Sequence, residues 1–139
     1  MKKIGLIFVL SFLLNFIWEI SQASLFAPHY VGITGLLVVH LRASLGDIIM
    51  ISIILMLDIL IFGRAYDEKI NVQRIFTMAF IGFILAVLVE KYALAAGRWA
   101  YNPLMPIVPW LDVGLTPALQ MMLTPPAVFL IFTRLKRIL

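Results

Sequence analysis

The sequence predicts an all-α integral membrane protein, a four-helix bundle with both termini on the cytoplasmic side. Three observations favour this fold class. Apolar residues make up 63% of the 139 residues and charged residues only 13%, whereas a soluble domain is about 45–50% apolar and about 25% charged. Four stretches are apolar and long enough to cross a bilayer, which takes about 20 residues. The Lys and Arg residues between these stretches are unevenly distributed.

The four stretches are expected to form one domain and to be helical, because a backbone in lipid must satisfy its own hydrogen bonds. They cover residues 4–23, 43–62, 75–96 and 113–133. The stretch 26–40 between the first two is too apolar for a free loop, but it is short and contains glycines. We therefore expect it to be a re-entrant or interfacial segment.

Basic residues predict the orientation of the spans. One side carries Lys2, Lys3, Arg64, Lys69, Arg74, Arg134, Lys136 and Arg137, and the other carries only Arg42, Lys91 and Arg98. The positive-inside rule therefore predicts cytoplasmic termini. An alternative is that residues 2–23 are a cleavable signal peptide, since two lysines, an apolar run and small residues follow one another there.

Composition also excludes several function classes. The chain has no cysteine, which excludes disulfides, thiolate metal sites and cysteine nucleophiles. Its basic residues form small groups rather than the continuous patch that nucleic-acid binding requires, so no nucleic-acid partner is expected. No nucleotide-binding or haem-binding motif is present, and no cofactor is expected.

Polar side chains from all four predicted helices fall at one depth, in the outer half of the membrane. An ionisable residue inside a span costs about 2.5–3.5 kcal/mol, so it needs a partner or a functional reason. These residues are Asn15, Trp18, Glu19, Gln22, Ser44, Asp47, Glu90 and Gln120. Hydrogen bonding between helices would explain the amides and the serine, but three acids at one level favour a functional cavity.

The three acids are the candidate catalytic residues, since general acid/base catalysis needs titratable groups within reach of the substrate. We expect Glu19 and Glu90 to be the acid and the base and Asp47 to orient the ligand; the other polar residues of the layer would bind it. Asp58 lies nearer the cytoplasm. It is expected to form a structural ion pair with Arg64 or with the basic residues at 134–137.

His29 and His40 flank the 26–40 segment, and together with the acids they would suit a hard or borderline metal ion. Neither has the spacing of a helical metal motif, so interfacial histidines are the preferred interpretation and no metal is expected. The connection 97–110 contains three prolines and three aromatic residues. It is either an anchored interfacial loop or a rigid lid, from which Arg98, Trp99 and Tyr101 would contact the ligand.

Glu90, the run Gly97-Arg98-Trp99-Ala100-Tyr101 and the proline-rich connection that follows resemble a region of membrane carotenoid enzymes, those of the lycopene-cyclase-domain type and related hydratases. The resemblance covers Glu90 to Pro109. It implies cofactor-free, acid-assisted proton addition to an isoprenoid double bond by carboxyl groups in a membrane cavity. The paired acids that follow a proline in such cyclases are absent, because Pro109 precedes Trp110-Leu111-Asp112.

The chain is also similar to small bacterial membrane proteins with four spans, through Trp18-Glu19-x-x-Gln22 and Ala43-Ser44-x-Gly46-Asp47, which implies the bacterial cytoplasmic membrane. Two hypotheses follow. The first is an outer-leaflet cavity that binds a lipid or isoprenoid, with acid/base catalysis on it. The second is a non-enzymatic binding protein or a proton- or cation-coupled transport component, including a homo-oligomer. An apolar lateral opening favours the first, and polar groups continuing toward the cytoplasm favour the second.

Overall fold

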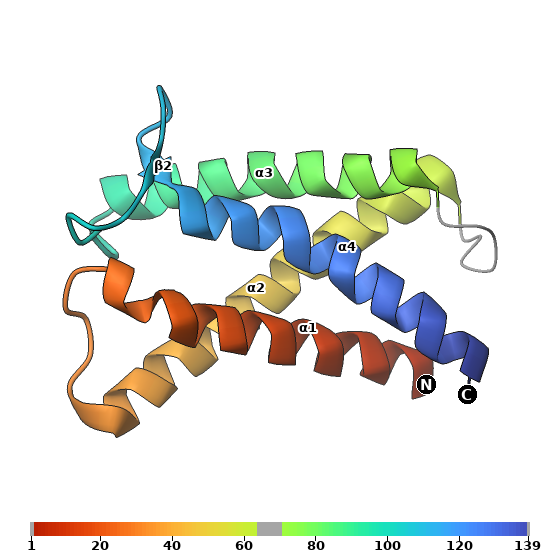
Figure 1. Ribbon diagram of the computed structural model, residues 1–139, viewed down its shortest axis with the longest axis horizontal. Coiled ribbons are helices and arrows are strands. Elements are labelled where there is room, and N and C mark those ends of the chain that lie inside the picture. Colours follow the sequence, from red (N-terminus) through yellow and green to blue (C-terminus); the bar gives the residue numbers. More distant parts are fainter. Residues whose placement is uncertain (1, 64–70, 139) are drawn as a thin grey trace.

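The protein is described by a computed structural model that covers residues 2–63 and 71–138, and four helices pack there into a bundle (Figure 1). They are α1 (Lys2–Gln22), α2 (Gly32–Phe62), α3 (Val72–Ala95) and α4 (Leu115–Ile138), and a 3-10 turn, η1 (Ala23–Leu25), follows α1. All four are long and apolar enough to cross a membrane, as the sequence predicts. Arg64 and Lys69, which the orientation argument counts, lie outside the described residues.

Helix α2 begins at Gly32, well before the predicted start at residue 43. The predicted re-entrant segment is therefore too long, because residues 32–40 are helical and only residues 26–31 remain outside a helix. Nothing between Gly32 and Phe62 breaks the helix: this stretch contains no proline. Its 31 residues correspond to about 46 Å at 1.5 Å per residue, which exceeds the roughly 30 Å hydrocarbon core. α2 crosses the bundle obliquely in Figure 1.

Helix α4 lies at the centre of the bundle. Of its apolar span 56% is buried, against 11% for α1, 17% for α2 and 22% for α3. It stays helical through Pro125 and Pro126. The apolar core joins α4 to its neighbours and consists of Ile51, Ile54, Leu55, Met78, Ala86, Met121 and Phe129.

Two connections are tied together at the end of the bundle away from the termini, which is termed the loop end (Figure 1). The backbone N–H of Ala27 donates to the carbonyl of Ala100 at 2.9 Å, and that of Asn102 donates to the carbonyl of Leu25 at 2.9 Å. Within the second connection, β1 (Ile107–Val108) pairs antiparallel with β2 (Val113–Gly114). The Ala27–Ala100 and Asn102–Leu25 bonds hold the α1–α2 and α3–α4 connections side by side at the loop end.

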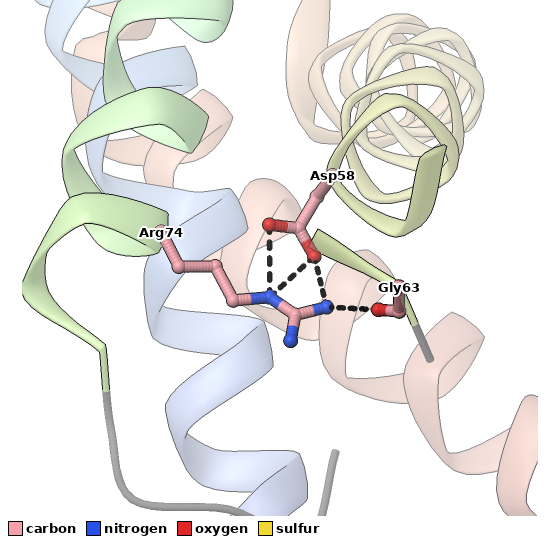
Figure 2. Close-up of polar contacts among 3 residues, drawn as sticks. All are labelled: Asp58, Gly63 and Arg74. Carbon is pink, nitrogen blue, oxygen red and sulfur yellow. Dashed lines mark hydrogen bonds and ion pairs between the residues drawn. The ribbon is translucent and has the colours of Figure 1, made fainter. Parts of the chain in front are cut away.

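The opposite end of the bundle, which carries the termini, contains a buried ion pair between α2 and α3 (Figure 2). The Arg74 Nε donates to Asp58 Oδ1 at 2.9 Å and Oδ2 at 2.7 Å, and its Nη2 donates to the Gly63 carbonyl at 3.1 Å. The expected ion pair of Asp58 is thus present, and its partner among the described side chains is Arg74; the expected partner Arg64 lies outside the described residues. The reason for this pairing is positional, since Arg74 in the first turns of α3 faces the last turns of α2 across their short connection.

Candidate functional site

A cavity of about 690 Å³ lies between the four helices and the two connections at the loop end. Its polar and charged lining residues are Glu19, Gln22, His29, His40, Arg42, Asp47, Glu90, Arg98, Trp99 and Gln120. Its apolar lining residues include Phe26, Val39, Ala43, Met50, Ala86, Val89, Pro117 and Met121. The polar layer and the apolar wall therefore belong to one cavity.

The structure brings most of the predicted site residues to this cavity. The three acids line it, as do Gln22, Arg98, Trp99 and Gln120. Four others, Asn15, Trp18, Ser44 and Tyr101, are not part of the lining. The Ser44 Oγ donates to the carbonyl of His40 at 2.7 Å within α2, which occupies its hydroxyl proton, and Trp18 is half-buried on α1.

Gln120 of α4 is the centre of a hydrogen-bond network that joins three helices. Its Nε2 donates to Asn15 Oδ1 of α1 and to Asp47 Oδ2 of α2, both at 2.9 Å. Its Oε1 accepts from Gln22 Nε2 at 2.9 Å, and the same Gln22 nitrogen donates to Glu19 Oε1 at 3.0 Å. Because α4 is central, one amide on it reaches the acids of both α1 and α2.

The hydrogen bond that Asn15 donates to a backbone carbonyl fixes which atoms donate and which accept in the rest of this network. Asn15 Nδ2 donates to the carbonyl of Ser11 at 2.8 Å, which leaves Asn15 Oδ1 to accept from Gln120. The Gln120 amide nitrogen must therefore face Asn15, and its oxygen must face Gln22. The Gln22 nitrogen then donates to both Gln120 and Glu19. As a result the Gln22 Oε1 is buried with no hydrogen-bond partner among the residues that the structure describes.

Glu90 accepts hydrogen bonds from two residues of the α3–α4 connection. Its Oε2 accepts from the Trp99 indole N–H at 3.3 Å and from the Tyr101 hydroxyl, whose oxygen accepts from the Gly114 N–H at 2.8 Å. Burial and the hydrogen bond to Glu90 raise the pKa of Tyr101 above its ordinary value, so this hydroxyl is a neutral donor at physiological pH. Trp99 and Tyr101 therefore position the carboxyl group, and of the two only Trp99 lines the cavity.

Acids occupy the cavity without close counter-charges. Glu19, Asp47 and Glu90 are near enough for their charges to interact. Among the described side chains, none of the three forms an ion pair, and the two arginines that line the cavity, Arg42 and Arg98, are exposed. The acids thus stand in the interior and the arginines at the rim.

His29 and His40 stand together, with ring centroids 5.3 Å apart. The Nδ1 of His29 bonds to the Ala27 carbonyl at 2.8 Å and that of His40 to the Leu36 carbonyl at 2.7 Å. A carbonyl only accepts, so each Nδ1 is the donor in these bonds. Within the described part of the chain, no group of three or more metal-ligating side chains is placed to hold a metal ion.

Sequence reasoning missed the apolar half of the site. Phe26, Met50 and Pro117 line the cavity, but in a chain this apolar nothing distinguishes them from lipid-facing residues. Arg42, which the sequence places on the outer side, also lines the cavity.

Comparison with known proteins assigns no family to this chain. No protein-family model matches it, and neither a curated protein nor a solved structure does. What the site does is therefore argued from its own residues.

Proposed function

We propose that this protein binds a membrane lipid or isoprenoid in the cavity at the loop end and that Glu90 and Glu19 act on it as base and acid. In this proposal the chain spans a bacterial cytoplasmic membrane four times, both termini are cytoplasmic, and the cavity lies in the outer half. The proposal needs no cofactor, since the carboxyl groups supply the proton transfer.

One observation carries the proposal: the cavity joins a polar interior to an apolar wall from two helices. Ala43 and Met50 of α2 line it together with Ala86 and Val89 of α3. These helices lie close at their shared connection and diverge toward the loop end (Figure 1). Such a site suits an amphiphile, whose apolar chain lies against the wall while its polar end meets the acids.

The alternative of a proton- or cation-coupled transport component needs polar groups that continue toward the other membrane face. Below the Gln120 network the core is apolar and includes Ile51, Ile54 and Met78, which are at most 1% exposed. The next buried charges are Asp58 and Arg74, which bond each other. An apolar layer of this kind opposes the passage of a proton or cation through the bundle. It therefore favours ligand binding and chemistry within the cavity.

The hydrogen bonds support a division of the two roles. Glu90 Oε2 receives donors from Trp99 and Tyr101, and two donors suit a carboxylate that accepts a proton from the bound molecule. Glu19, whose Oε1 accepts from Gln22, supplies the proton. Asp47, bonded to Gln120, keeps the network oriented.

The test has two parts. Mass spectrometry of the full chain, extracted with its surrounding lipid, should detect a specifically retained lipid or isoprenoid. A Glu90→Gln variant should retain that molecule but lose its conversion, whereas Lys91→Gln, a change at the exposed neighbouring residue, should leave both unchanged. If no lipid is retained and reconstituted vesicles conduct protons, the binding proposal is wrong and the transport hypothesis replaces it.

A further inference from the structure

We propose that the molecule bound in the cavity is an aminophospholipid, whose primary ammonium group lies among the carboxyl groups and whose phosphate lies at the arginine rim. This inference rests on the proposed lipid-binding function and names its ligand class. It is argued from the acceptors in the interior, the cations at the rim and the apolar wall, in that order.

The interior of the cavity is rich in hydrogen-bond acceptors and negative charge. Three carboxyl groups line it without an ion pair among the described residues, and Glu90 is only 5% exposed. Carboxylates taken out of water need a compensating cation. A ligand that carries positive charge and N–H donors would meet both needs.

Gln22 gives a second, independent indication of a donor. It lines the cavity and is 4% exposed, and its Oε1 has no partner in the described part of the chain. An unsatisfied buried acceptor costs about 1–3 kcal/mol, and the network leaves no freedom to turn the amide. The carboxyl groups of Glu19, Asp47 and Glu90 add further acceptors to the same cavity. An ammonium group with three N–H donors fits such a set, whereas a trimethylammonium group has no N–H to give.

Two arginines complete the pattern at the rim. Arg42 comes from α2 and Arg98 from the connection after α3, and both are exposed while lining the cavity. Guanidinium groups bind phosphate with paired hydrogen bonds. The two arginines lie nearer the rim of the cavity than the acids do. This order suits a headgroup whose phosphate is near the membrane surface and whose ammonium group is folded inward.

The apolar wall excludes a free headgroup as the occupant. Val39 and Met50 of α2 and Ala86 and Val89 of α3 line the cavity beside the polar groups. Acyl chains would lie against this wall, which phosphoethanolamine alone would leave empty. Ammonium, phosphate and chains together define an aminophospholipid.

The experiment compares lipids that differ in one feature at a time. The full chain is placed in nanodiscs of a phosphatidylglycerol background, and native mass spectrometry measures binding of phosphatidylethanolamine and phosphatidylcholine with identical acyl chains. We expect about a tenfold preference for phosphatidylethanolamine, equivalent to about 1.4 kcal/mol. Equal binding of the two, or a preference for phosphatidylglycerol, would overturn the inference.

Variants separate the two halves of the headgroup. Gln22→Leu, which removes the unpaired acceptor, should reduce the preference for phosphatidylethanolamine over phosphatidylcholine. Arg42→Gln should weaken both lipids alike and keep the preference, because both carry the phosphate, and Arg134→Gln at the opposite end of α4 should change neither. If Gln22→Leu fails to fold, the comparison of phosphatidylethanolamine with phosphatidylcholine on the wild-type protein still tests the inference.

The failure of this inference is distinguishable from that of the proposed function. Retention of an isoprenoid or another lipid, with no preference for the primary amine, overturns the aminophospholipid and leaves the lipid-binding proposal standing. Absence of any retained lipid overturns both.

Discussion

Gly82 of α3 lies directly against the backbone carbonyl of Met121 in α4. A Cβ placed at Gly82 would overlap the Met121 carbonyl oxygen and would lie 2.7 Å from its carbonyl carbon. The carbonyl is available for this contact because Pro125, four residues later, has no N–H to bond to it. Proline in one helix and glycine in the other thus let two backbones meet, which is how membrane helices commonly pack.

Gly82→Ala is therefore expected to destabilise the bundle. The added methyl group meets backbone rather than a flexible side chain, so α3 and α4 must move apart, and overpacking of this kind costs about 1–3 kcal/mol. Thermal unfolding in detergent measures the effect. Gly5→Ala is the matched control, because a Cβ at that helical position meets nothing within 4 Å. Equal stability of the two variants would contradict the close approach.

Replacing only one residue of the Asp58–Arg74 pair is expected to lower the stability of the protein. Asp58→Asn or Arg74→Gln leaves a buried charge unpaired, which costs about 3–5 kcal/mol. Replacing both with apolar residues, as in Asp58→Leu with Arg74→Met, should cost less than the sum of the single changes. A double-mutant cycle by thermal unfolding checks this.

Arg134→Gln, a change at an exposed arginine of α4, is the control for the ion pair and should shift stability by less than about 0.5 kcal/mol. Strict additivity of the Asp58 and Arg74 changes would mean that the two side chains do not interact.

Tyr101 is expected to make stability fall in alkaline solution. Its pKa is raised in the folded protein by burial and by the bond to Glu90, whereas in the unfolded chain it titrates near its usual value of about 10. Its contribution to stability is therefore fully present below pH 10 and is lost as the pH rises above that value. Melts from pH 8 upward should show this loss in the wild type and a smaller one in Tyr101→Phe. Tyr92→Phe, at an exposed position, should behave as the wild type does; an unchanged profile in Tyr101→Phe would contradict the role of the buried hydroxyl.

The orientation predicted from basic residues is testable with single cysteines, since the chain has none of its own. Leu104→Cys, at a position that is 77% exposed in the second connection, should react with an impermeant thiol reagent in intact cells. Gln73→Cys at the start of α3 should react only after the membrane is opened. The reverse pattern would turn the bundle over and place the cavity on the cytoplasmic side.

Several features of the fold could be predicted because they depend on local composition. Hydropathy identified four spans, and the structure has four helices long and apolar enough to cross a membrane. The spacing of Glu19 and Gln22 put them on one face of a helix, where they bond each other. The start of α2 at Gly32 differs from the prediction, because glycines such as Gly32 and Gly35 often interrupt helices but are tolerated by a helix in an apolar environment.

The partners of the polar side chains could not be predicted. Gln120 bonds to Asn15, 105 residues away in the chain, and Asp58 bonds to Arg74, which was not among the partners that the sequence suggested. Depth in the membrane follows from position in a span, but rotation of each helix about its axis does not. The bond that Tyr101 donates to Glu90 was likewise not predicted.

The sequence by itself thus determined four apolar helices and a layer of acids and amides at one level, because both follow from residue order and the thickness of a bilayer. Only the tertiary structure decided that α4 is central and that Gln120 on it bonds Asp47 directly and Glu19 through Gln22. It also decided that the Gln22 Oε1 has no hydrogen-bond partner among the described residues. The physical reason is that hydrogen bonds are directional, so their pairing depends on the packing angles and rotations of the helices, which no single segment encodes.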